Sequence, residues 1–335
     1  MSAFAERLAR YEAGPPVRGV PAAGAGFEHR VMEAPGDLPQ APGLAPLVTQ
    51  PVRRAVYLDV ETTGLSTAGA ALAFVVGILV RDEAAARAHL FVLWDPGAEG
   101  PMLEAVRDTL AGAMGPGAVL VTFNGRRFDV PLLAARCGRL GLAAPPWTPH
   151  LDALDHARRL LRYDLAHRNL SVLEAHLLGA RRRGDVSGAE IPKIYEAFVA
   201  SPCTKTRAAV ERVVQHNRWD LEGLCRVAGA LARIEAAPRT LGQAVGVARR
   251  LLRRDRPQAA ADLLGPRVAA ERDRLARCRP ELAADAACTL LQALLRSGRP
   301  GDLARARALA AWAGRRLPFD DRPARLLRRV AGACL

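Results

Sequence analysis

Three apolar runs of strand length follow one another between residues 55 and 94 of this chain. They are rich in β-branched and aromatic residues, and polar segments separate them. The runs are Ala55–Val60, Ala73–Val80 and Ala88–Trp94. Because consecutive strands with short links usually pair with each other, the sequence predicts an antiparallel meander that forms the frame of a domain.

Helices and strands alternate after the meander. Apolar residues at helical spacing predict a series of helices, with one long helix or two at its end. These helices span 101–113, 131–140, 153–161, 192–200 and 206–234. Further strands are expected at 118–122 and 150–152, and Ser171 is the expected N-cap of a helix that Gly179 ends. The pattern predicts a mixed α/β domain over residues 53–236.

The regions on either side of this domain differ from it. Residues 1–52 are rich in Pro, Gly and Ala, which predicts an extended or loosely wrapping arm with a short helix over Met1–Tyr11. Residues 240–335 carry Leu, Ala and Arg at helical spacing, and similar Arg/Pro segments recur at 253–257 and 296–300. They indicate two helical hairpins of a solenoid, or a chance similarity in an Ala/Arg/Leu-rich sequence.

Two acidic residues, Asp59 and Glu61, stand at the end of the first predicted strand. Side chains repeat every two residues along a strand, so both carboxylates point to the same face. In an apolar context this is costly unless a cation neutralises them, and carboxylate oxygens suit Mg²⁺ or Mn²⁺. Alternatively, one carboxylate faces solvent and the other caps the turn that Gly64 opens.

Two more acids add to this pair. Asp129 follows a predicted strand and a Gly-containing loop, and Asp220 lies in the last predicted helix of the α/β domain. His216 is four residues before Asp220, so the two share a helix face. A pair of metal ions that acts on a phosphodiester needs several carboxylates from separate elements, and an imidazole can accept the proton of the attacking water.

At these residues the sequence resembles the DEDD superfamily of exonucleases. The resemblance rests on Asp-x-Glu at Asp59, Asn-x-x-x-Phe-Asp at Asn124 and His-x-x-x-Asp at His216. It is closest to the YprB-type ribonuclease H-like proteins, whose nuclease-like domain often precedes a tetratricopeptide-like helical region. The resemblance implies a ribonuclease H-like fold, two bound Mg²⁺ or Mn²⁺ ions, and Asp59, Glu61, Asp129 and Asp220 as their ligands.

The same resemblance gives His216 the position of the general base. Only three residues separate it from Asp220, whereas histidine-type members usually have four, and three is the spacing of members with tyrosine there. His216 is therefore either the base or a residue that only orients water or phosphate. The resemblance also implies substrate contacts, which would come from Thr62, Thr63, Gly64 and Leu65.

Three further residues are candidates for substrate binding, each with a structural alternative. Asn124 either binds substrate or stabilises its own turn. Arg126 and Arg127, beside Asp129, either contact phosphate or form a solvated turn.

The net charge of +14 and the pI of about 10.7 favour a polyanionic partner, above all DNA or RNA. Nearly all basic residues are arginines, so the codon bias of a GC-rich genome is the alternative explanation. The six cysteines lack the spacing of a zinc site. No segment predicts a membrane span or a secretory signal, so we expect a cytoplasmic protein.

These observations favour a metal-dependent nuclease, in particular a 3′→5′ exonuclease acting through two metal ions. The alternative is a catalytically weak module that binds nucleic acid or assembles with a protein partner through its C-terminal helices. A glycosidase fits poorly, because acids two residues apart on one strand are too close together to flank a sugar bond.

Overall fold

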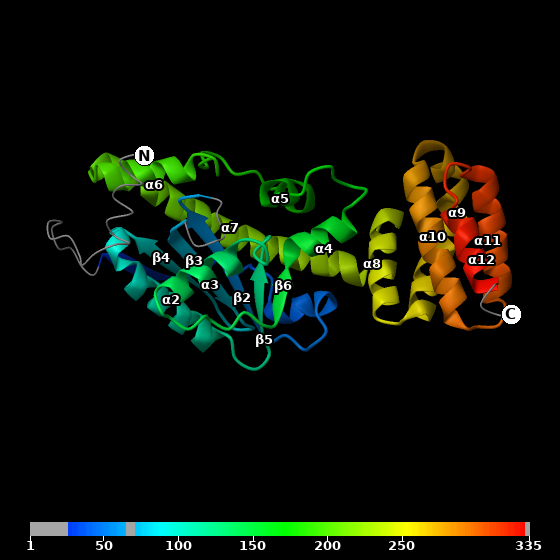
Figure 1. Cartoon of the computed structure of the whole chain (residues 1–335), viewed down its shortest axis with the longest axis horizontal. Coiled ribbons are helices and arrows are strands. Elements are labelled where there is room, and N and C mark those ends of the chain that lie inside the picture. The colour runs from blue at the N-terminus through cyan, green and yellow to red at the C-terminus, as the bar shows by residue number, and fades with distance from the viewer. Residues whose placement is uncertain (1–25, 65–70, 332–335) are drawn as a thin grey trace. The chain divides into compact units, whose positions relative to one another are not determined.

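The computed structural model describes residues 26–64 and 71–331, which fold into two compact units (Figure 1). The first, called the α/β unit, comprises Met1–Asp155 and Asn169–Ala232. The second, called the helical unit, comprises His156–Arg168 and Arg233–Leu335. The helix expected over Met1–Tyr11 lies outside the described residues. Within the described ranges, no helix combines the length and the apolar character needed to cross a membrane.

A six-stranded sheet forms the centre of the α/β unit, with the strand order β1-β4-β3-β2-β5-β6. β2, β3 and β4 pair antiparallel as the predicted meander, and β5 and β6 continue the sheet parallel to β2. The mixed α/β fold is therefore confirmed. The strands are β1 (Phe27–Glu33), β2 (Arg54–Thr62), β3 (Ala73–Arg81), β4 (Ala86–Leu93), β5 (Ala118–Thr122) and β6 (His150–Asp152).

β1 corrects the prediction of a loose arm before residue 53. It pairs antiparallel with β4 along its whole length and forms one edge of the sheet. Its sequence lacks alternating apolar residues, so periodicity gave no strand signal. The strand is partly exposed, and Val31 is 56% exposed. A distant contact helps to hold β1 in place, because Arg30 donates two hydrogen bonds to Glu211, of 2.7 and 2.8 Å.

Helices flank the sheet, with α2 and α3 on one side and α7 on the other (Figure 1). Gly77 of β3 permits the close approach of α7, because a Cβ there would lie 2.0 Å from Asn217 Oδ1 and 2.7 Å from Leu221 Cδ1. Asp59 is paired with Gly77 in the register, so it faces α7 as well. The helices are α2 (Glu99–Ala113), α3 (Asp129–Arg139), α4 (Ala153–Leu160), α5 (Leu170–Leu178), α6 (Ile191–Ala200) and α7 (Thr204–Ala236), with 3₁₀ turns at Ala41–Leu47 and Pro96–Ala98.

The start of α5 differs from the prediction. Asn169, not Ser171, is its N-cap, and its side chain accepts a hydrogen bond of 2.9 Å from the backbone N–H of Val172. Ser171 lies within the first turn, and its hydroxyl donates to Asn169 Oδ1. Both residue types are good caps, so composition alone did not distinguish them. Gly179 ends α5 in the left-handed conformation, as expected.

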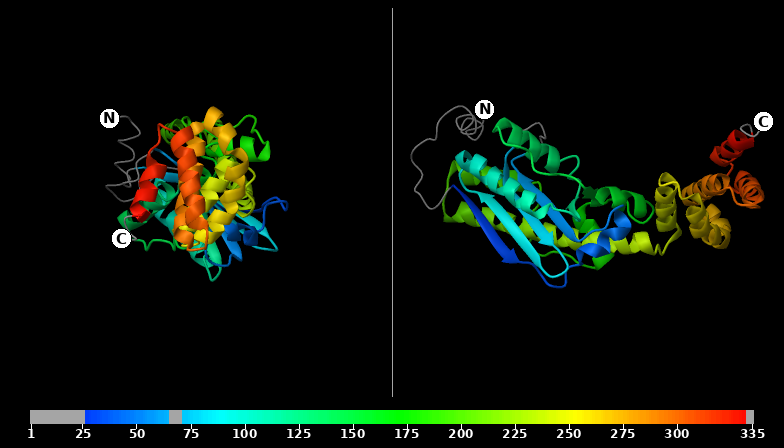
Figure 2. Two further views of the ribbon diagram at one scale, coloured as in Figure 1. Left: turned by 90° about the vertical axis from the view of Figure 1, so that its right-hand side faces the viewer. Right: turned by 90° about the horizontal axis from the view of Figure 1, so that it is seen from below.

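The helical unit is built around α10, which contacts the other four helices of the α8–α12 series (Figure 2). Short Arg/Pro turns join α8 to α9 and α10 to α11, so each pair forms a helical hairpin. Residues 156–168 belong to this unit, where Arg159 Nη2 bonds Glu235 Oε2 at 2.5 Å. The helices are α8 (Leu241–Arg253), α9 (Pro257–Cys278), α10 (Pro280–Ser297), α11 (Asp302–Arg316) and α12 (Arg322–Ala331).

Candidate metal centre

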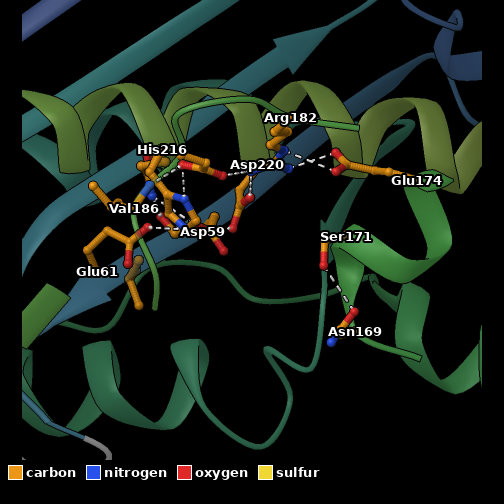
Figure 3. Close-up of polar contacts among 12 residues, drawn as sticks. Asp59, Glu61, Asn169, Ser171, Glu174, Arg182, Val186, His216 and Asp220 are labelled. Atoms are coloured by element: carbon orange, nitrogen blue, oxygen red, sulfur yellow. Dashed lines mark hydrogen bonds and ion pairs between the residues drawn. The ribbon is translucent and has the colours of Figure 1, made fainter. Parts of the chain in front are cut away.

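The carboxylates of β2 meet the polar side chains of α7 (Figure 3). Asn217 Nδ2 donates to Asp59 Oδ2 at 2.8 Å and to the Asp59 carbonyl oxygen at 3.2 Å. Two residues further along the strand, Glu61 Oε1 lies 3.9 Å from His216 Nε2. Asp59 and Glu61 therefore both face α7, as the period of a strand requires.

α7 presents His216 and Asp220 on one face. His216 Nε2 lies 3.5 Å from Asp220 Oδ2, the distance expected for neighbours one turn apart. One ligand atom from each of Glu61, His216 and Asp220 lies within 4.8 Å of the other two. These three side chains, from a strand and a helix far apart in the sequence, could together hold a metal ion.

Asp129 approaches the same region from the first turn of α3. It is 5% exposed, and its Oδ1 accepts a hydrogen bond of 3.2 Å from the backbone N–H of Val60. Burial raises the pKa of Asp129 to about 7 although backbone hydrogen bonds lower it, and the charges of Asp152 and Asp220 raise it further. Asp129 is thus electrostatically part of the acidic group, although it is outside the three-residue ligand set.

The other buried acids show the same effect. Burial, and then the negative charge of Asp220, raise the pKa of Asp59 and of Glu61 well above the ordinary carboxyl range. The charges of Glu61 and Asp129 also raise the pKa of Asp59, and the charge of Asp129 raises the pKa of Glu61, so these acids repel one another. A divalent cation would offset this repulsion, and carboxylate oxygens are the ligands that Mg²⁺ and Mn²⁺ prefer.

Arg182 brings a positive charge to one side of the acidic group (Figure 3). It makes a two-pronged contact with Glu174, with Nη2–Oε1 at 2.7 Å and Nε–Oε2 at 3.0 Å, and its Nη1 bonds Asp220. Gly223 leaves room for this pair, since a Cβ there would lie 1.7 Å from Glu174 Oε1. Asp220 is therefore balanced by an arginine, whereas no such ion pair is present at Asp59, Glu61 or Asp129 among the described residues.

Asp185 determines which ring nitrogen of His216 carries the hydrogen. His216 Nδ1 lies 2.7 Å from Asp185 Oδ1, and an ionised carboxylate only accepts hydrogen bonds, so Nδ1 carries the hydrogen. In the neutral ring this leaves a lone pair on Nε2, the atom that faces Glu61 and Asp220. Three electron-rich atoms thus converge on one small space, where a cation or a proton is needed.

The predicted substrate residues Thr62, Thr63 and Gly64 lie at the end of β2 and directly after it. Thr62 Oγ1 donates to the Gly64 carbonyl oxygen at 2.7 Å. Thr63 Oγ1 accepts from the backbone N–H of Leu72 at 3.0 Å, so both hydroxyls stabilise the end of β2. Leu65 lies outside the described residues.

The loop before Asp129 is organised by Asp152. Its carboxylate accepts backbone hydrogen bonds from Asn124 at 2.9 Å and from Arg126 at 3.2 Å. Asn124 has a positive φ of 66°, which agrees with its alternative role in the turn. Both arginines are exposed, but the Arg126 side chain bonds the His150 carbonyl oxygen. Of the two arginines, Arg127 is the freer to meet a phosphate.

Asn217 and Asp185 are two residues of the site that were not predicted from the sequence. Asn217 could have been found, because it is three residues before Asp220 and so shares its helix face. Asp185 lies in an irregular segment 31 residues before His216, and its contact with that ring has no periodic signal.

A protein-family match agrees with the fold. A family model described as the RNase H superfamily matches residues 56–232, from β2 through most of α7. Among solved structures, the family B DNA polymerase from the hyperthermophilic archaeon Pyrobaculum calidifontis matches with a TM-score of 0.41 and 13% identity. That match covers 62% of this chain but only 30% of the polymerase. No curated protein matches the sequence.

Proposed function

The chain belongs to the RNase H superfamily, and from this premise we propose that it is a metal-dependent nuclease that hydrolyses phosphodiester bonds of DNA or RNA. The convergence of Glu61, His216 Nε2 and Asp220, beside the buried acids Asp59 and Asp129, is the observation that carries the proposal. We further propose 3′→5′ exonuclease action with two Mg²⁺ or Mn²⁺ ions. The resemblance of the three acidic motifs to those of DEDD exonucleases supports this finer assignment.

The four acids would hold the cations. Bound there, a divalent cation lowers the pKa of a coordinated water and neutralises charge on the scissile phosphate. Asn217 positions Asp59 by its hydrogen bond of 2.8 Å, and the Val60 N–H positions Asp129. These supports matter, because reacting groups must be held close to their productive geometry.

His216 would serve as the proton acceptor. Asp185 holds the hydrogen on Nδ1, so when the acids alone hold the cations, Nε2 can accept the proton of the attacking water. The imidazolium that forms keeps its hydrogen bond to Asp185, which stabilises the positive charge. Arg182, fixed by Glu174, would counter negative charge beside Asp220, and the exposed Arg127 would contact a phosphate.

A cleavage assay tests the proposal. Single- and double-stranded DNA and RNA, each labelled at the 5′ or the 3′ end, are incubated with the full chain in Mg²⁺, Mn²⁺ or EDTA. We expect cleavage with the metals alone, and a loss of more than about 100-fold in Asp59→Ala, because a metal ligand acts in the chemical step. Glu83→Ala, which removes an exposed acid of the same unit, is the control and should retain full activity.

Three outcomes distinguish the proposals. Products that shorten stepwise from the 3′ end support exonuclease action, and internal fragments contradict it. Cleavage in EDTA, or equal rates in Asp59→Ala, would exclude the proposed metal centre. Binding without cleavage in every metal would favour the second candidate, the catalytically weak binding or assembly module. The Arg182–Asp220 ion pair supports that candidate, because the arginine occupies a carboxylate that the metal centre needs.

A further inference from the structure

The net positive charge of this chain comes from the helical unit. That unit contains 26 arginines against 11 aspartates and glutamates, which gives +15. The α/β unit contains 22 basic residues against 23 acidic ones, which gives −1. The unit with the candidate metal centre therefore has no overall attraction for a polyanion, whereas the helical unit has a strong one.

Codon bias does not explain this division. Both units are encoded by one gene, so a GC-rich genome would enrich arginine in both. Arginine makes up 26 of 116 residues in the helical unit but only 20 of 219 in the α/β unit. The α/β unit thus serves as an internal control, and the excess needs a reason in the helical unit itself.

The two Arg/Pro turns gather part of this charge at one end of the helical unit. Arg296 Nη2, at the end of α10, bonds Asp255 Oδ1 in the α8–α9 turn at 2.8 Å. Arg299 Nη1, in the α10–α11 turn, bonds Asp262 Oδ1 of α9 at 2.5 Å. The repeat seen in the sequence therefore places two arginine-rich turns side by side.

We call this surface the basic end. Its arginines are all exposed at the residue level, and they come from both turns and from the first turn of α11. They are Arg253, Arg254, Arg256, Arg296, Arg299 and Arg305. Three acids face them, and the ion pairs of Arg296, Arg299 and Arg305 involve arginine side chains that are 42–53% exposed. Such exposed pairs are weak, so these arginines can exchange a carboxylate for another anion.

Positive charges crowd the α8–α9 turn of the basic end. The pKa of Arg254 is lowered, first by partial burial and then by the positive charge of Arg250. The acid in this turn, Asp255, is engaged with Arg296. A bound anion would relieve the crowding, and a guanidinium makes paired hydrogen bonds to phosphate.

We propose that the helical unit is the nucleic-acid-binding module of this protein and contacts the phosphodiester backbone through the basic end. Because the contacts are to phosphate, binding is independent of sequence and weakens steeply with salt. Both units belong to one chain, so a strand held by the helical unit is present at raised local concentration for the α/β unit. The choice of nucleic acid over other polyanions rests on the proposed nuclease function.

Salt-dependent binding tests this assignment. The full chain in EDTA is titrated against a fluorescent single strand of about 30 nucleotides, from about 50 to about 200 mM salt. The variant Arg253→Gln/Arg254→Gln/Arg256→Gln should bind about tenfold more weakly, and its slope of log K against log salt should be smaller by about 2, for three lost phosphate contacts. The control Arg53→Gln/Arg87→Gln/Arg212→Gln removes the same charge from exposed positions of the α/β unit and should leave the slope unchanged.

A lysine version of the same triple variant keeps the charge and should retain the wild-type slope, so a folding defect of the glutamine version would not obscure the result. Equal slopes in wild type and glutamine variant, or an equal loss in the control, would overturn the inference. So would tight binding of phosphatidylglycerol vesicles without binding of the oligonucleotide.

A small substrate separates this inference from the proposed function. The p-nitrophenyl ester of thymidine 5′-monophosphate offers one phosphodiester and no long backbone. Its Mn²⁺-dependent hydrolysis should be the same in wild type and in the glutamine variant. No hydrolysis, together with the expected change in slope, would reject the nuclease and keep the binding module. Normal hydrolysis with an unchanged slope would do the reverse.

Discussion

Buried acids in the candidate metal centre of the α/β unit and in the helical unit have surroundings of opposite charge. In the helical unit, Asp285 is 4% exposed and accepts hydrogen bonds from Tyr163, from Arg249 and, at 2.9 Å, from Arg322. Burial alone would raise its pKa, yet these partners hold the pKa of Asp285 below the ordinary value. In the α/β unit, burial and neighbouring acids raise the pKa of Asp59 instead.

This difference distinguishes an acid that the fold neutralises from acids that repel one another. A fold readily supplies arginine and tyrosine partners for a buried carboxylate, and the helical unit does so. The α/β unit leaves Asp59, Glu61 and Asp129 with raised pKa values, although arginine is abundant in the chain. Buried acids with raised pKa values are typical of a site that binds a cation from solution.

The pH dependence of stability should show the contrast most strongly. Without metal, native Asp129 stays protonated up to about pH 7, whereas in the unfolded chain it ionises near pH 4. The native state therefore binds the extra proton between these values, and its stability falls by about 4 kcal/mol as the pH rises through this interval. Asp285 has a lowered pKa, so the helical unit loses stability only below about pH 4.

Hydrogen exchange in EDTA, resolved by peptide and corrected for the intrinsic rate at each pH, measures both units in one sample. Protection of β2 and β3 should fall from pH 4 to 7, and protection of α10 should not. Rising protection of β2 over this range would mean that the protein itself neutralises its acids.

Substitutions at the two acids should change stability in opposite directions. Asp285→Asn leaves Arg249 without its carboxylate partner and leaves Arg322 with Asp320 alone, and it should cost about 3 kcal/mol. Asp59→Asn removes a repelled charge but keeps an oxygen for Asn217, so the protein in EDTA should become more stable. Denaturant unfolding of both variants and of the wild type measures the sign of each change in the free energy of unfolding. Destabilisation by Asp59→Asn would mean that the fold neutralises that acid.

Added metal should stabilise the α/β unit and leave the stability of the helical unit unchanged. At a Mn²⁺ concentration about 100 times its Kd, we expect the α/β unit to gain about 2.7 kcal/mol of stability. Asp220→Asn, which alters the proposed ligand set, should remove most of this gain, and the exchange of α10 should stay the same with and without metal. Equal stabilisation of both units would point to binding outside the candidate metal centre.

Sequence periodicity predicted the parts of the molecule that local repetition determines. The alternation along β2 placed Asp59 and Glu61 on one face, and the four-residue spacing placed His216 beside Asp220. The meander and the helical hairpins follow from the same kind of pattern. Each of these features depends on residues that are close in sequence.

The features that were missed depend on contacts between distant residues. β1 is held by pairing with β4 and by the Arg30–Glu211 ion pair, whose members are 181 residues apart. Asp185 reaches His216 from an irregular loop. The net charge of each unit can be counted from the sequence, but only when the boundaries of the units are known. The structure supplies these boundaries and assigns residues 156–168 to the helical unit.

Two helix caps allow a finer test of whether the units act separately. Asn169 caps α5 in the α/β unit, and Thr240 caps α8 in the helical unit, where Thr240 Oγ1 accepts from the Gln243 N–H at 3.2 Å. Replacing either by Ala should cost about 1 kcal/mol. α5 also carries Glu174, which fixes Arg182 beside Asp220, so Asn169→Ala should slow Mn²⁺-dependent hydrolysis of the small substrate. Thr240→Ala should lower only the protection of α8 and leave that hydrolysis unchanged, and an equal loss in both variants would mean that the catalytic geometry depends on the helical unit.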